Sequence, residues 1–147
     1  MRVVSNSSSN QNHTPMIGDV YMMNFTGDAN EQQGWRPGLV FQNNLGNKYS
    51  PNIVALPLTS SIKKTTQPTH VALAAKDTGL KLDSMVLCEN PNTISKNKIG
   101  RYLTSLPDEC MKKVAVAHIL ASSAISFLSK EDMFGVWKEA SKLNFAS

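Results

Sequence analysis

Apolar residues recur in the first two thirds of the chain as short runs separated by polar, turn-forming segments. Such runs are typical of strands when they alternate with polar positions or end at Gly, Pro and Asn. Because no helical pattern separates them, the expected fold is mainly β (α+β), a small antiparallel barrel or strongly bent sheet. The predicted strands are residues 18–25, 38–42, 53–58, 69–73 and 84–88, with edge pieces at 93–94 and 100–103. Residues 43–47 are predicted to be a turn-rich loop, and Gly79 a turn residue with positive φ.

The last third of the chain changes to apolar spacings of three and four, which indicate amphipathic helices. One helix is predicted to follow the N-capping signal Ser105–Leu106–Pro107–Asp108 and to pack on the sheet. Its apolar stripe is Met111, Val114, Ala117, Ala121, Ala124, Ile125 and Leu128. The capping signal recurs at Ser129–Lys130–Glu131–Asp132 and predicts a second helix, about Lys130 to Leu143. We favour packing of this second helix on the first. The alternative is a surface for another protein.

The domain organisation follows from these patterns. Residues 1–15 are mostly Ser, Asn and Gln and are predicted to be a disordered polar tail. Residues 16–128 are predicted to form one barrel domain with its C-terminal helix, and residues 129–147 an additional C-terminal amphipathic helix. A chain of 147 residues with 41% hydrophobic residues can bury the core of one such domain.

The charge distribution favours an anionic partner. The net charge is +4, and residues 36–101 contain nine Lys and Arg against three acidic residues. Such a surplus is typical of nucleic-acid binding. The lysines are scattered, however, so an ordinary solvated surface explains the charge equally well.

Cysteine and histidine usage argues against disulfide and metal sites. Cys88 lies in an apolar run and Cys110 in a predicted early helical turn, so both are expected to be free thiols. The three histidines lack ligand spacing, and no metal or cofactor is predicted. His70 alternates with apolar neighbours in a strand, which favours a structural role. The chain shows no apolar run long enough to span a bilayer and no secretory signal, so a cytoplasmic protein is expected.

The segment Glu31–Pro37 carries the candidate chemistry. It is predicted to be a polar, mobile loop that delivers Arg36 to the start of a buried strand, with Pro37 holding Arg36 extended. Thr59 ends a strand that we expect to be a neighbour. The pair suits cleavage of RNA by its own 2′-OH, which requires stabilised phosphorane charge and no protein nucleophile. Arg36 offers a planar fork of donors, whereas a guanidinium is a poor base.

The polar residues around this pair complete the candidate site. Trp35 is expected either to stack on a base or to cover a dimer edge. The predicted catalytic residues are Arg36 and Thr59, and the predicted RNA-binding residues near them are Glu31, Gln32, Gly34, Trp35, Ser60, Ser61 and Lys64.

Six short motifs stand in one order and at one spacing along the chain. They are Gly18–Asp19–Val20–Tyr21, Glu31–Gln32–x–Gly34–x–Arg36–Pro37, Gln42–Asn43, Gly46–Asn47–x–x–Ser50–Pro51, Leu58–Thr59 and Pro68–Thr69–His70–Val71. With them the chain resembles the MazF/PemK (Kid) toxins of type II toxin–antitoxin systems, and in particular the Gram-positive MazF-like branch. The resemblance covers about residues 16–128.

This resemblance implies an SH3-like barrel, a homodimer and a growth-inhibiting mRNA interferase. Such an enzyme is a metal-independent endoribonuclease that cuts single-stranded mRNA at short sequences and leaves 2′,3′-cyclic phosphate and 5′-OH ends. The resemblance assigns Arg36 and Thr59 as the catalytic pair and places Glu31, Gln32 and Gly34 in the substrate loop. It also implies a small antitoxin whose disordered tail occupies the RNA channel, and DNA binding by the toxin–antitoxin complex.

One segment departs from the family pattern. The Gram-positive sequence Glu-Gln-x-Arg-Thr-Ile-Asp is replaced here by Glu89–Asn90–Pro91–Asn92–Thr93–Ile94–Ser95, which loses a cation and gains a proline. In the family this segment lies near the RNA groove, so the resemblance implies that Glu89 and Asn90 are also RNA-binding residues. Because the segment differs here, the cleavage sequence is left open. The alternative function is a non-catalytic barrel that binds RNA or inhibits a protein target such as gyrase.

Overall fold

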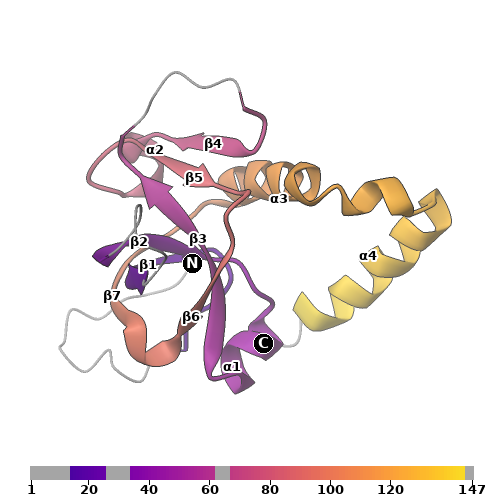
Figure 1. Cartoon of the computed structure of the whole chain (residues 1–147), viewed down its shortest axis with the longest axis horizontal. Coiled ribbons are helices and arrows are strands. Elements are labelled where there is room, and N and C mark those ends of the chain that lie inside the picture. Colours follow the sequence, from indigo (N-terminus) through magenta and orange to yellow (C-terminus); the bar gives the residue numbers. More distant parts are fainter. Residues whose placement is uncertain (1–13, 26–33, 62–66, 145–147) are drawn as a thin grey trace.

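The computed structural model describes residues 14–25, 34–61 and 67–144 (Figure 1). Its strands are β1 (Asp19–Phe25), β2 (Gly34–Val40), β3 (Asn52–Thr59), β4 (His70–Leu73), β5 (Ser84–Leu87), β6 (Asn92–Ser95) and β7 (Ile99–Ser105). Its helices are α1 (Asn44–Tyr49), α2 (Ala75–Thr78), α3 (Asp108–Ser122) and α4 (Lys130–Asn144), with short 3₁₀ helices η2 (Lys96–Lys98) and η3 (Ala124–Phe127).

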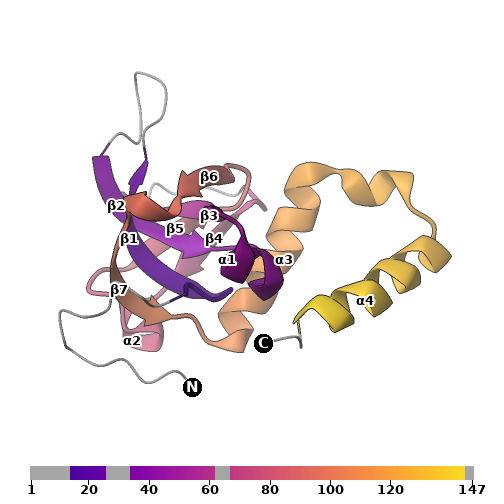
Figure 2. The same ribbon diagram turned by 90° about the horizontal axis from the view of Figure 1, so that it is seen from below.

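All strand pairs are antiparallel and form one strongly bent sheet. The order of the strands is β4-β5-β3-β2-β1-β7, and β6 pairs with β3 off this path. The strand β3 belongs to both parts of the sheet, because its first half pairs with β6 and its last two residues pair with β5. The sheet therefore curls around β3, as the view turned by 90° shows (Figure 2). The predicted antiparallel sheet with C-terminal helices is confirmed.

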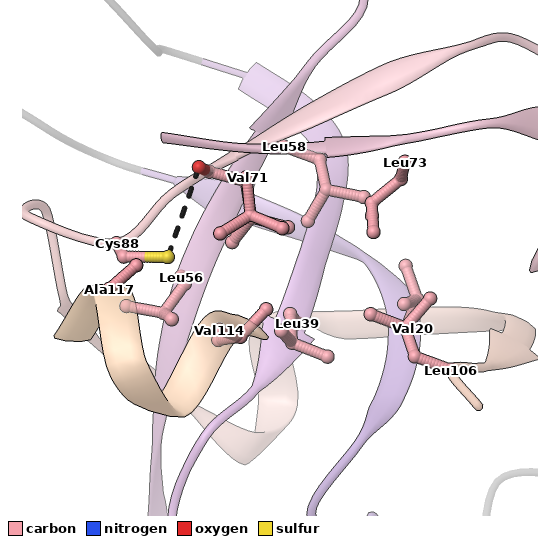
Figure 3. Close-up of a cluster of buried hydrophobic side chains, with 11 residues drawn as sticks. Val20, Leu39, Leu56, Leu58, Val71, Leu73, Cys88, Leu106, Val114 and Ala117 are labelled. Carbon is pink, nitrogen blue, oxygen red and sulfur yellow. Dashed lines mark hydrogen bonds between the residues drawn. The ribbon is translucent and has the colours of Figure 1, made fainter. Parts of the chain in front are cut away.

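The alternation of side chains along the strands produces two apolar clusters on opposite faces. On one face, residues from five strands meet Val114 and Ala117 of α3 (Figure 3). On the other face, Tyr21, Met23 and Phe25 of β1 pack with residues of β2, β3 and β6. Gly38 allows this close packing, because a Cβ atom there would lie only 2.7 Å from the sulfur of Met23.

Two predicted boundaries before β3 are wrong. The strand β2 was expected at residues 38–42 but spans Gly34–Val40, and Gly34 pairs with Phe25, so the end of the predicted loop is strand. The predicted loop at 43–47 is largely helix α1. The side chain of Asn43 accepts a hydrogen bond from Gly46 N at 2.8 Å, and the fully buried Asn47 side chain donates to Gln42 O at 2.8 Å. These side-chain bonds stabilise a helix in a sequence typical of turns.

The first C-terminal helix also differs from its prediction at both ends. Ser105 does not cap it; its hydroxyl donates to Asp19 Oδ1 at 2.7 Å, and Pro107 takes the N-cap position without a side-chain bond. The helix stops at Ser122 because Ser123 has a positive φ of 55°. The predicted apolar stripe therefore ends with α3, and Ile125 and Leu128, which follow it, are exposed.

The helix α4 forms as predicted. The prediction that it packs on α3 is wrong. The turn at Ser123 and η3 lead the chain away, and α4 lies apart from α3 in both views, approaching α1 instead (Figures 1 and 2). Phe134 and Trp137 on α4 are 62% and 66% exposed. Its predicted capping box is present, because Ser129 N donates to Asp132 Oδ2 and Asp132 N donates to Ser129 Oγ.

Several smaller predictions can be compared with the structure. Gly79 has a φ of 82° and ends α2, as predicted. Cys88 is a buried core residue and Cys110 is half-buried, and both are free thiols. Residues 1–13 of the predicted disordered tail (residues 1–15) lie outside the described residues, and Pro15 is buried. In the part of the chain that the structure describes, no helix is long and apolar enough to cross a membrane.

Candidate active site

Arg36 is held on β2 against the neighbouring strand. The guanidinium donates from Nε to Leu58 O at 3.1 Å and also from Nη2 to the same carbonyl. Gly38 pairs with Pro57, and extending this register by two residues puts Arg36 opposite Thr59 on one face of the sheet. The predicted catalytic residues are therefore neighbours. Pro37 holds the extended backbone that this arrangement requires.

The guanidinium keeps donors for a further partner. Arginine has five N–H donors, and two of them are used by Leu58 O. No carboxylate lies within ion-pair distance of Arg36 among the residues that the structure describes. Partial burial lowers the pKa of the Arg36 guanidinium, because removing the cation from water disfavours its charged form. An anion with two oxygens, such as a phosphodiester, would restore the lost solvation.

The hydroxyl of Thr59 is oriented by a short local turn. Its oxygen accepts a hydrogen bond from Ser61 N at 3.1 Å, so the O–H proton is available to another acceptor. Thr59 is half-buried, whereas Ser60 and Ser61 after it are exposed. The end of β3 thus presents hydroxyl groups next to the guanidinium of Arg36.

The other predicted RNA-binding residues fall into three groups, two of which lie in the part of the chain that the structure describes. Gly34, Trp35, Ser60 and Ser61 lie on the same strand ends as the catalytic pair. Trp35 is 55% exposed, and its ring lies over Gly100 of β7, where a Cβ atom would be 3.0 Å from Cζ3. Glu31, Gln32 and Lys64 lie outside the described residues.

Glu89 and Asn90 are not brought to the catalytic pair. They lie in the turn between β5 and β6, beside the middle of β3 rather than its end. Glu89 accepts hydrogen bonds from His70 Nε2 at 2.8 Å and Thr69 Oγ1 at 3.0 Å. This pairing gives Glu89 a structural partner and agrees with the structural role expected for His70.

A cavity beside the end of β3 includes residues that the sequence did not single out. It has a volume of about 480 Å³ and is lined by Thr59, Ser60 and residues of β1, β2, the α2–β5 connection and β7. Two of the lining residues, Lys81 and Arg101, are basic and exposed. No local motif marks them, because they come from separate parts of the chain, the α2–β5 connection and β7.

The fold and this site can be compared with known proteins. A family profile described as "PemK-like, MazF-like toxin of type II toxin-antitoxin system" matches residues 16–120. The chain belongs to this family. The profile includes β1–β7, nearly all of α3 and both predicted catalytic residues, and it ends before η3 and α4.

Individual members of the family support the assignment. Endoribonuclease EndoA of Bacillus subtilis is 40% identical over 111 residues, which cover 75% of this chain and 96% of the relative. Endoribonuclease MazF of Staphylococcus saprophyticus is 40% identical over 98 residues, 66% of this chain and 82% of the relative. Both are Gram-positive endoribonucleases, so the predicted branch of the family is confirmed.

A solved structure shows the same fold. A mycobacterial endoribonuclease in complex with its cognate antitoxin superposes with a TM-score of 0.63 at 28% identity. The match covers 75% of this chain and 96% of the mycobacterial chain. This neighbour therefore shares the fold of most of this chain.

Proposed function

We propose that the protein is the toxin of a toxin–antitoxin system. It cleaves single-stranded RNA without a metal ion, with Arg36 and Thr59 as its catalytic residues. The observation that carries this proposal is the Arg36 guanidinium, held on Leu58 O opposite Thr59 with no described carboxylate partner. The relatives named endoribonucleases support it. A cation kept unpaired at the end of a strand suits a phosphate that arrives with the substrate.

The reaction is an internal transfer of the phosphoryl group. The ribose 2′-oxygen attacks the adjacent phosphorus, the bond to the 5′-oxygen breaks, and the products end in a 2′,3′-cyclic phosphate and a 5′-OH. The 2′-OH loses one proton and the 5′-oxygen gains one, so proton balance is kept with solvent water. Arg36 donates to the non-bridging oxygens as negative charge accumulates on them, and Thr59 donates a further hydrogen bond.

The environment of Arg36 favours charge stabilisation over proton abstraction. A guanidinium remains protonated in proteins, so it does not take the 2′-OH proton. The hydrogen bonds from Arg36 to Leu58 O fix the plane of the guanidinium before substrate binds. This reduces the reorganisation needed in the transition state. Thr59 is likewise oriented in advance by Ser61 N.

The partners that we propose are those of the family. The chain would form a homodimer in the cytoplasm and be inhibited by a small antitoxin, and the complex of the two would bind DNA. A mycobacterial relative has been solved with its cognate antitoxin.

The test is cleavage of a long single-stranded transcript by purified protein in EDTA. The expected products accept a 5′ label from polynucleotide kinase without phosphatase treatment, because their 5′ ends are hydroxyls. Arg36→Ala serves as the control for contaminating ribonuclease, and Lys130→Ala, an exposed cation on α4, is the matched charge control. A protein that binds the transcript and makes no cut would instead be a non-catalytic RNA-binding barrel. Mapping the cut ends would also give the cleavage sequence.

A further inference from the structure

We propose that the cavity beside Thr59 holds the base of a nucleotide next to the scissile phosphate, and that Lys81 and Arg101 bind the flanking RNA backbone. This inference rests on the proposed function and assigns it a subsite. The cavity of about 480 Å³ is within the range of small-ligand pockets, about 300–1,000 Å³. Most of its wall is apolar, which suits a planar base more than a phosphate.

The position of the cavity relative to Arg36 follows from the strand register. Arg36 lies opposite Thr59 in this register, and Thr59 and the next residue, Ser60, both line the cavity. The carbonyl of Leu58 holds Arg36, and the same residue forms a wall of the cavity. The guanidinium of Arg36 and the cavity are thus both next to the end of β3, so one RNA strand can reach both of them.

The charges at the cavity favour an anionic chain. Lys81 comes from the α2–β5 connection and Arg101 from β7, and both are exposed on different walls. No acidic residue lines the cavity. The nearby Asp83 is turned toward α2, because its carboxylate accepts a hydrogen bond from Ala75 N at 2.8 Å. An apolar cavity rimmed by two cations is the combination used by proteins that bind single-stranded nucleic acid.

The two basic walls are fixed to each other. Thr104 of β7 donates a hydrogen bond from Oγ1 to Thr78 O at 2.7 Å, which ties the end of α2 to β7. Gly79 follows with a φ of 82°, and a Cβ atom there would lie 3.1 Å from Thr104 Oγ1. The connection that carries Lys81 is therefore held close to the strand that carries Arg101. Such a site is formed before the ligand binds, which lowers the entropic cost of binding.

Salt-dependent binding tests the two cations. The probe is a 14-nucleotide 2′-O-methyl RNA, which cannot be cleaved. Its sequence is that of the mapped cut site or, if the transcript is not cut, another segment of the same transcript. We expect Lys81→Gln/Arg101→Gln to reduce the slope of log affinity against log salt by about 1.4, since each single-strand phosphate contact contributes about 0.7. The control Lys130→Gln/Lys138→Gln, with two exposed cations removed from α4, should keep the wild-type slope. Equal slopes for the two double variants would overturn the inference.

Single abasic positions test the cavity itself. Removing the base that occupies it should weaken binding to the wild type by roughly 5- to 100-fold, the range expected for one stacked base. Leu82→Trp, at a lining residue that is 63% exposed, should fill the opening without disturbing the core, so the same abasic position should then have little effect. An abasic profile identical in wild type and Leu82→Trp would overturn the proposal. All of these variants keep Arg36 and Thr59, and the binding tests use RNA that cannot be cleaved. If the wild type fails to cleave RNA, that result therefore contradicts only the proposed function.

Discussion

The barrel and the C-terminal arm, by which we mean η3 and α4, both carry large apolar side chains but bury them differently. Val20, Leu39 and Leu56 in the barrel are completely buried, whereas Phe127 and Trp137 in the arm are 87% and 66% exposed. The family profile includes the barrel and ends before the arm. Helical spacing predicts which face of an element is apolar, but it does not tell what covers that face.

The barrel also contains all the candidate chemistry that the structure describes. Arg36, Thr59 and the adjacent cavity lie at the ends of strands whose side chains are fixed by the two clusters. The arm presents its apolar residues to solvent, with η3 next to α3 and α4 approaching α1. The two regions should therefore respond differently to mutation, in activity and in stability.

The largest expected difference is in catalysis. Arg36→Ala should lower the rate of RNA cleavage by about 10²–10³-fold, the usual effect of removing a preorganised donor to a developing oxyanion. The arm variant Phe134→Ser/Trp137→Ser should leave the rate unchanged. Rates would be measured on one fluorogenic RNA that contains the mapped cut site. Circular dichroism of each variant checks that the fold is retained, and an Arg36→Ala protein as fast as its parent would contradict the assignment.

Much of the barrel could be predicted from local pattern. Alternating apolar residues located the strands, and the Arg36–Pro37 pair predicted the extended backbone that puts the guanidinium beside Thr59. The Ser129–Asp132 box predicted the start of α4 because its hydrogen bonds join residues three apart. In each case the interaction is local, or depends on one strand and its neighbour.

The missed features depend on contacts that no local pattern records. The helix α1 forms around the buried amide of Asn47, in a sequence that otherwise indicates turns. Lys81 and Arg101 are twenty residues apart and line one cavity, which depends on long-range contacts such as the hydrogen bond from Thr104 Oγ1 to Thr78 O. The end of α3 is set by the positive φ of Ser123, a residue type that seldom adopts this conformation.

The next difference is in stability. Leu56→Ala should lower the free energy of unfolding by about 2–5 kcal/mol, because it leaves a cavity among fully buried side chains. Trp137→Ala should change it by less than about 0.5 kcal/mol, as is usual for exposed positions. Urea unfolding followed by circular dichroism measures both values. Comparable losses for the two variants would show that the arm is part of the cooperative core.

Thiol reactivity gives a smaller, local contrast. Burial, with a contribution from Glu89, raises the pKa of the Cys88 thiol to about 12. At pH 8 only about one molecule in 10⁴ then has the reactive thiolate. We expect iodoacetamide to modify an introduced Ser126→Cys in the arm first, Cys110 more slowly, and Cys88 only after unfolding in urea. Mass spectrometry of peptides from timed samples tests this order, and early labelling of Cys88 would contradict its burial.

The smallest expected effect is a pH dependence confined to the arm. Hydrogen bonds from the backbone and hydroxyl of Ser129 lower the pKa of the exposed Asp132 carboxyl. A carboxyl whose folded pKa lies below its unfolded value, about 3.9, stabilises the helix above that pH. This contribution disappears as the pH falls through the folded pKa, so α4 should fray below about pH 4. In a Trp35→Phe background, Trp137 is the remaining tryptophan and its emission reports the change.

The matched variant for this experiment is Asp132→Ala, which removes the titrating group and keeps Ser129. Its Trp137 emission should already resemble that of the acid form at pH 7 and should change less between pH 5 and pH 3 than that of its parent. Ser129→Ala should shift the midpoint of the transition only part of the way toward the ordinary pKa of aspartate, because it removes the hydroxyl but keeps the backbone N–H that donates to the Asp132 carboxylate. If the parent and Asp132→Ala titrate identically, the acid response belongs to groups outside the arm. The arm would then unfold only together with the barrel, and the difference between the two regions would be one of exposure alone.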